Sequence, residues 1–323
     1  MRYEYQSSQA PFGKITPTTM PRIIDCTYMP IIQESPPPST SIPSILRFSK
    51  RLVFITTNNA PIWLKKLTGS PILTLKTKEF KEYSSIRQLK VNQNYSIYLR
   101  PEFDIGLKRT LALMDAQRKG YRSILLLDDD IHLTQHQLEC GGSVIDDDVI
   151  SIAGFHVQGF ADISTLQHIE HRIQRSRPSI TMTGSALFID PSRVNPLFAQ
   201  IYNDDLFFFL KQSDPNSIVS IGTSWQRPRN PLIKETRIPH EEYGDIIYES
   251  LRKKWGQTSG TAEISWSEEL SNRVERISDL IANTSNPTYL SALKVARNAL
   301  TSFKPSDLQT TLDQLGLQSW SLK

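Results

Sequence analysis

The chain has 323 residues, of which 38% are hydrophobic and 22% are charged, a composition typical of a globular protein with one large domain and appendages. No apolar run approaches the roughly 18 to 20 residues that a membrane helix needs, and the first residues lack the apolar core of a secretory signal. We therefore expect a cytoplasmic protein without a transmembrane segment. The net charge of +4 comes without a run of Lys and Arg interleaved with aromatics, which disfavours nucleic acid and favours a small anionic partner.

The chain divides into three regions by composition. Residues 1–48 hold eight prolines and little apolar periodicity, so we predict an extended N-terminal arm. In residues 49–256 short apolar runs alternate with amphipathic stretches, which predicts an α/β domain with a mostly parallel sheet flanked by helices. Its predicted strands are 51–56, 71–75, 95–99, 123–127, 150–155 and 184–189, and its predicted helices lie near 61–68, 105–119, 204–211 and 241–254. Residues 257–323 show helical spacing and predict a helical C-terminal appendage.

The stretch "LLLDDDI", residues 125–131, runs a buried strand straight into three aspartates. In open α/β sheets the carboxyl ends of the strands border the ligand site. If the chain stays extended, Asp128 and Asp130 share one side and Asp129 points the other way. Paired carboxylates favour a bound Mg²⁺ or Mn²⁺, and the alternative is an acidic surface turn of the kind that "IDDD" at 145–148 is expected to form.

Several motifs in residues 49–256 resemble the nucleotide-sugar-dependent glycosyltransferases with the GT-A fold, particularly the family 2 type. Asp128 and Asp130 match the family's D-x-D motif. The stretch "GLKRTLALMDAQRKGY", with Gly106 and Arg109, is similar to the glycine-led helix that precedes that motif. The stretch "TMTGSALFIDPSRV" is similar to the strand whose glycine borders the acceptor, and "YNDDLFFFL" followed by "RIPHEEYG" resembles the family's acidic helix start and later histidine.

The resemblance implies a Rossmann-like GT-A sheet and a metal-dependent, inverting transfer of a sugar from a nucleotide diphosphate to an acceptor. It implies Asp205 as the catalytic base, with Asp204 as the alternative. It implies Asp130 and His240 as ligands of Mn²⁺ or Mg²⁺. The residues that it implies for donor binding are Thr56, Thr57, Arg109, Asp128, Asp129 and Gly184.

Other interpretations of the same residues stay open. Asp204 and Asp205 at a helix start complement the helix dipole, and His240 opens another helix. A uridine diphosphate sugar is the commonest donor in the family, but "LTLKTKEF" offers no Asp where the family often contacts the base. The acceptor and the oligomeric state are not indicated.

Two other functions compete with glycosyl transfer. A sugar nucleotidyltransferase would share the sheet and the carboxylates, but it normally carries a Gly-rich basic loop where this chain has "TTNNAPIW". A catalytically silent binding or scaffold protein would use the proline-rich arm and the helical tail as interaction surfaces.

Overall fold

The computed structural model describes residues 23–31, 41–56, 62–65, 104–158, 163–176, 182–212, 214–227, 235–256 and 263–317. The strands are β1 (Cys26–Pro30), β2 (Leu52–Ile55), β3 (Ile124–Leu127), β4 (Ile131–His132), β5 (Ile152–Gln158), β6 (Met182–Ile189) and β7 (Ile218–Gln226). The helices are α1 (Ser41–Phe48), α2 (Ile62–Lys65), α3 (Ile105–Arg118), α4 (Gln135–Val144), α5 (Thr165–Gln174), α6 (Asp204–Leu210), α7 (Ile238–Gly256), α8 (Trp266–Ala282), α9 (Pro287–Ser302) and α10 (Pro305–Leu315). The predicted strands at 71–75 and 95–99, and Thr57, lie outside the described residues.

The strands form one seven-stranded sheet in the order β2-β1-β3-β6-β5-β7-β4. The predicted α/β class is confirmed, but the sheet is evenly mixed and not mostly parallel. The pairs β1–β2, β1–β3 and β5–β7 are parallel, whereas β3–β6, β5–β6 and β4–β7 are antiparallel. An apolar run indicates that a strand is buried and does not indicate its direction, so the sequence pattern could not distinguish the two arrangements.

Strand β1 lies inside the region that the sequence analysis predicts to be an extended arm. It pairs with β2 on one side and with β3 on the other, and every one of its five residues is buried. The arm prediction is therefore wrong for residues 26–30, and also for residues 41–48, which form helix α1 and contribute Ile45 and Phe48 to the core. The prolines of this region, including Pro30, disfavoured the prediction of a strand. Proline is nevertheless tolerated at the end of a strand, where its missing N–H costs least. The boundaries of the three regions otherwise stay a prediction.

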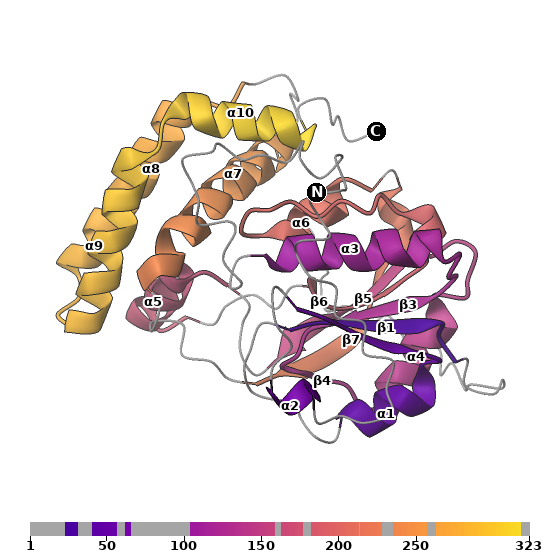
Figure 1. Cartoon of the computed structure of the whole chain (residues 1–323). Coiled ribbons are helices and arrows are strands. Elements are labelled where there is room, and N and C mark those ends of the chain that lie inside the picture. The colour runs from indigo at the N-terminus through magenta and orange to yellow at the C-terminus, as the bar shows by residue number, and fades with distance from the viewer. Residues whose placement is uncertain are drawn as a thin grey trace.

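Helices cover both faces of the sheet (Figure 1). Helices α3 and α6 lie on one face, and α1 and α4 lie on the other. The alternation along the strands follows from the two-residue period of side chains. Leu126 of β3 packs in the core beneath α3 and α6, while Leu125 and Leu127 pack in the core against α1 and α4. Burial on both faces explains why β3 reads as a continuous apolar run.

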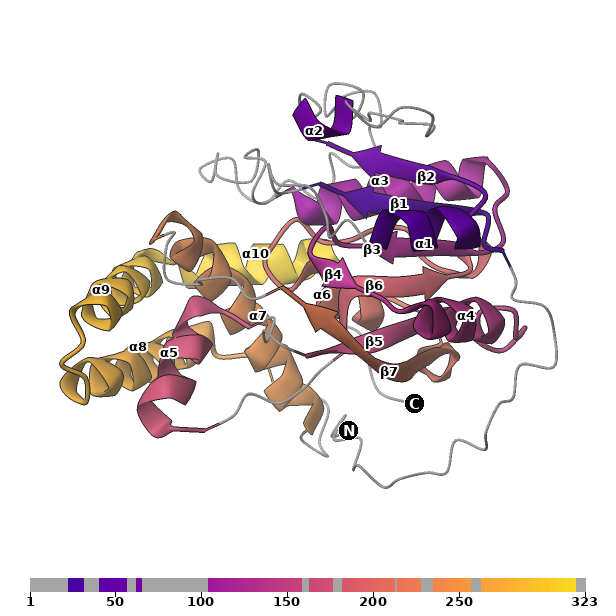
Figure 2. The same cartoon turned by 90° about the horizontal axis from the view of Figure 1, so that it is seen from below.

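Helices α5 and α7 to α10 form a separate group beside the sheet, as the two views show (Figures 1 and 2). Their apolar faces meet in one core that includes Tyr243 and Ile247 of α7, Ile277 of α8, Leu293 of α9 and Leu308 of α10. The predicted C-terminal helices are confirmed. Helix α7 packs with them in the same core, so the last helix of the predicted transferase domain and the predicted appendage share their apolar contacts.

A buried network of charges joins α7 to α8. Arg273 of α8 is 5% exposed and donates from Nε to Glu242 at 2.7 Å, from Nη2 to Asp245 at 2.9 Å and from Nη1 to Glu249 at 2.8 Å. Arg276, one turn later, pairs with Glu249 at 3.7 Å and also with Glu170 of α5. Charges removed from water are stabilised only if they are paired, so this network ties the two helices at a defined register.

The network predicts a dependence of stability on pH. Burial raises the pKa of Glu242 to about 7, against the lowering effect of Arg273 and with the help of Asp245 and Glu241. Between pH 4.5 and 7 the unfolded chain loses this proton while the folded chain keeps it, so stability falls as the pH rises. We expect Glu242→Gln to abolish this fall, so that urea unfolding at pH 5, 6, 7 and 8 shows the variant gaining stability relative to the wild type with rising pH.

Glu249 provides the matched control, because it lies on the same helix and binds the same Arg273. The pairing with Arg273 and Arg276 lowers the pKa of Glu249 although burial opposes it. Its contribution is therefore complete above its ordinary pKa and is lost only at lower pH. The stability difference between the wild type and Glu249→Gln should stay constant from pH 5 to 8. A parallel pH response of the two variants would contradict the assignment of the proton to Glu242.

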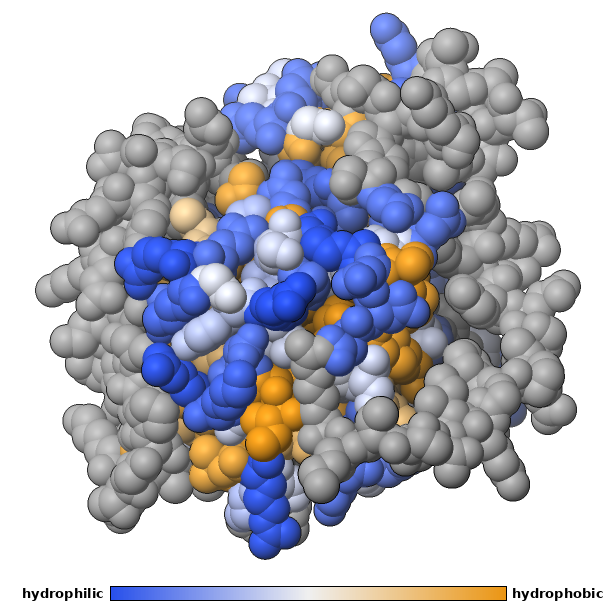
Figure 3. All heavy atoms as spheres, turned by 90° about the vertical axis from the view of Figure 1, so that its right-hand side faces the viewer, coloured by the Kyte–Doolittle hydropathy of each residue, from blue (hydrophilic) through white to orange (hydrophobic). Residues whose placement is uncertain are grey.

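The face on the right-hand side of Figure 1 is mostly hydrophilic over its described residues, with hydrophobic residues in small patches (Figure 3). Among the described residues, the large hydrophobic side chains that are exposed are Ile23, Leu46, Ile62, Val149 and Trp225. Within the described part of the chain, no helix combines the length and the apolar character required to cross a membrane.

Asp146, Asp147 and Asp148 are exposed, which confirms the acidic surface turn predicted at 145–148.

Candidate active site

Arg109 joins two acidic segments that are far apart in the sequence. Its Nη2 donates to both carboxylate oxygens of Asp128, at 3.0 and 2.8 Å, and its Nη1 donates to Asp204 at 2.9 Å. All three residues are buried. Asp128 follows β3 and Asp204 opens α6, so this guanidinium connects the strand end to the helix start. The predicted donor-binding and catalytic residues therefore lie in direct contact.

The three aspartates after β3 form a turn and do not continue the strand. The Asp128 amide donates to the carbonyl of Ser185 at 2.8 Å, and the Ile131 amide then donates back to the carbonyl of Asp128 at 3.2 Å. Asp130 accepts a hydrogen bond from Gln226 Nε2 at 3.0 Å. Asp128 and Asp130 have different partners, and the extended backbone on which their expected convergence depended is replaced by a turn into β4, so the convergence stays a prediction.

Asp205 is held by the strand that carries Gly184. The Gly184 amide donates to Asp205 Oδ2 at 2.6 Å, and the Leu206 amide donates to Oδ1 at 2.8 Å. A Cβ added to Gly184 would lie 2.7 Å from both Arg109 Nη1 and Asp205 Cβ. Any side chain at residue 184 would therefore push these groups apart, and glycine is needed here for close approach and not for an unusual φ.

We call Arg109, Asp128, Asp204 and Asp205 the Arg109 cluster. Burial alone would lower the pKa of Arg109, but the carboxylates of Asp128, Asp204 and Asp205 raise it above the ordinary value. Three formal negative charges stand against one positive charge. Asp129 is also buried and follows Asp128 directly. A buried excess of negative charge is costly unless a cation compensates it, so the electrostatics of the cluster fit a positively charged ligand.

His240 lies in the first turn of α7 and is 7% exposed. Burial lowers the pKa of His240 to about 3, with a further contribution from the charge of Arg237. Its imidazole is therefore neutral at physiological pH, the form that a metal ligand requires. Its ring makes an edge contact with the ring of Tyr202, with the centroids 6.4 Å apart. Tyr202 precedes Asp204 at the start of α6 by two residues, so His240 lies near that helix start.

A divalent cation at this site is a prediction that the donor chemistry supports. A carboxylate and a neutral imidazole both suit Mn²⁺, and the charge excess of the Arg109 cluster favours a cation. Within the described ranges, no three His, Cys, Asp or Glu side chains are grouped so that they could hold a metal ion. The assignment of Asp130 and His240 as ligands stays a prediction, in which water and phosphate oxygens would complete the coordination.

Thr56 directly follows β2 and lies apart from the Arg109 cluster. It is 3% exposed, and its Oγ1 has no hydrogen-bond partner among the residues that the structure describes. Strand β1 separates β2 from β3, so at about 4.8 Å per strand Thr56 lies on the order of 10 Å from the end of β3. This distance suits a ligand that spans several strand ends, with one part beside Thr56 and another beside Asp128.

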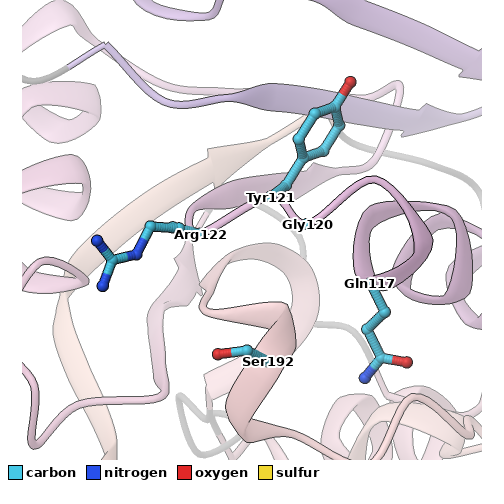
Figure 4. Close-up of a pocket in the computed structure, with 5 residues that line it drawn as sticks. All are labelled: Gln117, Gly120, Tyr121, Arg122 and Ser192. Atoms are coloured by element: carbon cyan, nitrogen blue, oxygen red, sulfur yellow. The ribbon is translucent and has the colours of Figure 1, made fainter.

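A separate cavity of about 400 Å³ is lined by Gln117, Gly120, Tyr121, Arg122 and Ser192. These residues precede or flank the start of β3, whereas the acidic run follows its end, so the cavity and the Arg109 cluster lie at opposite ends of that strand. The guanidinium of Arg122 and the amide of Gln117 point in different directions (Figure 4). The cavity therefore gathers no converging polar groups and is not the candidate site.

Two residues that hold the site had no predicted role in it. Gln226, at the end of β7, donates to Asp130. Asn203 precedes Asp204 in the left-handed conformation, with φ of 68°, and its side chain donates to Asp245. The "YND" sequence could have indicated Asn203, because asparagine adopts this conformation more readily than most residues. Gln226 gave no comparable signal.

No family profile matches the chain, and no curated protein matches it. Solved structures that it resembles include glucosyl-3-phosphoglycerate synthase from Mycobacterium tuberculosis in complex with Mn²⁺, UDP-glucose and phosphoglyceric acid, with 13% identity over 65% of this chain and 73% of that chain and a TM-score of 0.42. Another is S. aureus TarS 1-349 in complex with UDP-GlcNAc, with 11% identity over 87% of this chain and 91% of that chain and a TM-score of 0.43. The likeness is one of fold, and we take the chemistry of the site from its own residues.

Proposed function

We propose that the protein transfers a sugar from a nucleotide diphosphate sugar to an acceptor nucleophile, with inversion at the anomeric carbon. The observation that supports this most strongly is the double contact of Arg109, which brings Asp128 at the end of β3 together with Asp204 at the start of α6. A strand end is the usual ligand site of an open α/β sheet. Carboxylates beside it supply the groups that a cation and a base for the acceptor require, and the cation would compensate the charge of the donor diphosphate.

Asp205 is the base in this mechanism. It takes the proton from the acceptor hydroxyl while the acceptor oxygen forms a bond to the anomeric carbon. The bond from that carbon to the diphosphate oxygen breaks on the opposite face, and the diphosphate leaves with the electron pair. The Gly184 amide, at 2.6 Å from Asp205 Oδ2, orients the carboxylate. Arg109 keeps Asp204 and Asp128 in place, so that one side chain aligns the donor side and the acceptor side.

Asp130 and His240 would hold Mn²⁺ or Mg²⁺ near the diphosphate. When bound, such an ion stabilises the negative charge that develops on the leaving group. Thr56 would lie beside the nucleoside end of the donor, in keeping with its buried hydroxyl. A uridine diphosphate sugar is the first donor to test, because the resemblance implies it.

A donor-binding screen tests the proposal directly. Thermal shifts would be measured with UDP-, GDP- and dTDP-glucose and with UDP-N-acetylglucosamine, each with and without Mn²⁺, followed by release of the nucleoside diphosphate. Stabilisation by a donor in the presence of Mn²⁺, with slow donor hydrolysis, would support glycosyl transfer. Formation of a nucleotide sugar from a nucleoside triphosphate and a sugar phosphate would instead identify a nucleotidyltransferase. Stabilisation by a donor without any turnover would favour a binding protein.

The Asp130→Asn variant tests the metal assignment. It keeps the shape of the side chain and removes its charge. We therefore expect the Mn²⁺ concentration that gives half of the donor-induced thermal shift to rise about tenfold or more. The hydrogen bond from Gln226 is retained by the amide oxygen, so the fold should be preserved. Asp148→Asn, in the exposed turn, is the matched control and should bind Mn²⁺ and donor normally. Normal metal-dependent binding by the Asp130→Asn protein would remove Asp130 from the site.

A further inference from the structure

A chain of buried contacts leads from the C-terminal helices to the Arg109 cluster. Arg273 of α8 donates from Nη2 to Asp245 Oδ2 at 2.9 Å. The other oxygen, Asp245 Oδ1, accepts from Asn203 Nδ2 at 2.9 Å. Asn203 is followed directly by Asp204, whose carboxylate binds Arg109 at 2.9 Å. Three helices, α8, α7 and α6, are thus connected to the candidate active site by hydrogen bonds between named atoms.

Asn203 is the weak point of this chain. Its φ of 68° lies in the left-handed region, which few non-glycine residues adopt, although asparagine does so more readily than most. It occupies the N-cap position of α6, yet its side chain makes no capping hydrogen bond and reaches to Asp245 instead. Its carbonyl accepts from the Phe207 amide at 3.0 Å, which starts the helix. The contact with Asp245 therefore holds the residue that sets the direction of Asp204 and Asp205.

Asp245 is itself held from the other side by Arg273. Asp245 is 2% exposed, and burial raises its pKa although Arg273 opposes the rise. Ser164 also hydrogen-bonds to it. A buried carboxylate keeps its charge and its orientation only while its cationic partner is present. Without the guanidinium of Arg273, Asp245 would lose the hydrogen bond at Oδ2 that fixes its orientation toward the amide of Asn203.

We infer that Arg273 is a positioning residue for the acidic pair Asp204 and Asp205, acting through Asp245 and Asn203. The expected effect on catalysis rests on the proposed function. The structural connection from Arg273 to Asn203 rests on the hydrogen bonds alone. The C-terminal helices thus contribute to the site, because Arg273 of α8 orients the start of α6 through Asp245 and Asn203. Arg273 does not touch the Arg109 cluster itself.

Arg276 supplies a matched comparison within the same helix. It lies one turn after Arg273 and joins the same network through Glu249 and Glu170, and it has no contact with Asp245 among the ion pairs and hydrogen bonds described. Arg273→Lys keeps the positive charge but loses the guanidinium, whose nitrogens bind three carboxylates at once. Arg276→Lys makes the same chemical change one turn later and serves as the control. Asn203→Gly cuts the link at the other end, because glycine adopts a φ of 68° without strain and has no side chain to reach Asp245.

Hydrogen exchange and kinetics measured on the full-length protein test the inference together. Exchange of the amides at the start of α6, in a peptide spanning residues 203–210, should become about tenfold faster in Arg273→Lys and Asn203→Gly and stay unchanged in Arg276→Lys. For the donor of the UDP-, GDP- and dTDP-glucose panel that the wild type hydrolyses, kcat should fall about tenfold in the first two variants, with KM within about twofold. The double variant Asn203→Gly with Arg273→Lys should lose no more kcat than either single variant, because both changes cut one path.

The outcomes separate the inference from the proposed function. Unchanged exchange at α6 in Arg273→Lys would overturn the inference, and so would faster exchange with normal kcat in an active protein. Additive losses in the double variant would also overturn it, because Arg273 would then act by another route. Faster exchange in the two linked variants, combined with no turnover of any donor by the wild type, would support the positional link and overturn the proposed function.

Discussion

Asp205→Asn is expected to bind donor and metal as the wild type does while losing about 10² to 10⁴ in turnover, the usual effect of removing a general base. Asparagine has nearly the same shape, and its amide oxygen can still accept from Gly184. It cannot accept a proton from the acceptor at neutral pH. The measurement is kcat at saturating donor, with donor hydrolysis as the surrogate until an acceptor is identified, alongside the thermal shift with donor and Mn²⁺.

Asp204→Asn is the comparison variant, since the two aspartates are adjacent but have different partners. Asp204 is paired with the buried Arg109 at 2.9 Å, so we expect its loss to lower the free energy of unfolding by about 1 to 3 kcal/mol and to reduce turnover less than Asp205→Asn does. Near-normal turnover in Asp205→Asn with a collapse in Asp204→Asn would transfer the base to Asp204. Normal turnover in both would leave the acidic pair with a structural role alone.

Arg109→Met is expected to lower the free energy of unfolding by about 3 to 5 kcal/mol, the largest stability effect that we predict. Methionine replaces the aliphatic stem of arginine and removes the guanidinium group with its charge. Asp128 and Asp204, both buried, would then face each other and Asp205 with no cation among the described contacts of the cluster. Urea unfolding followed by circular dichroism at pH 7 measures the loss.

Arg118→Met is the control on the same helix. Arg118 pairs with Asp115 at 2.9 Å, but its side chain is 66% exposed, so the pair contributes about 1 kcal/mol or less. If Arg109→Met proves too unstable to purify, Arg109→Met combined with Asp128→Asn and Asp204→Asn should recover part of the lost stability, because the unpaired charges are removed together. No recovery in the triple variant would show that packing, and not charge, explains the loss.

Local patterns of sequence were sufficient for the elements near the site. The apolar run at Ile124–Leu127 predicted β3, and the amphipathic stretch after Asp104 predicted α3. The acidic pair before an aromatic run predicted α6. Each of these signals is contained within about ten residues, and the structure confirms each element within a few residues of its predicted bounds.

The contacts between distant residues could not be predicted in the same way. The pairing of Arg109 with Asp204 spans 95 residues, and that of Gln226 with Asp130 spans 96. Such pairs depend on how the strands are ordered and directed, which hydrophobic periodicity does not report. The turn at Asp128 to Ile131 is an exception, because its three aspartates belong to a residue type that favours turns and could have indicated that the strand ends there.

The position of β1 has a consequence for how the chain acquires its structure. Cys26 pairs with Ile124, so β1 leaves the ribosome long before the neighbour that it needs on one side. Its other neighbour, β2, follows soon after, and two strands alone are only marginally stable in water. Closing so long a segment costs chain entropy before the contact repays it, which slows folding and keeps apolar strands exposed in the meantime. The nascent chain of this protein is therefore expected to depend on chaperones until β3 has been synthesised, and its β1–β2 pair is the segment most exposed to misassociation.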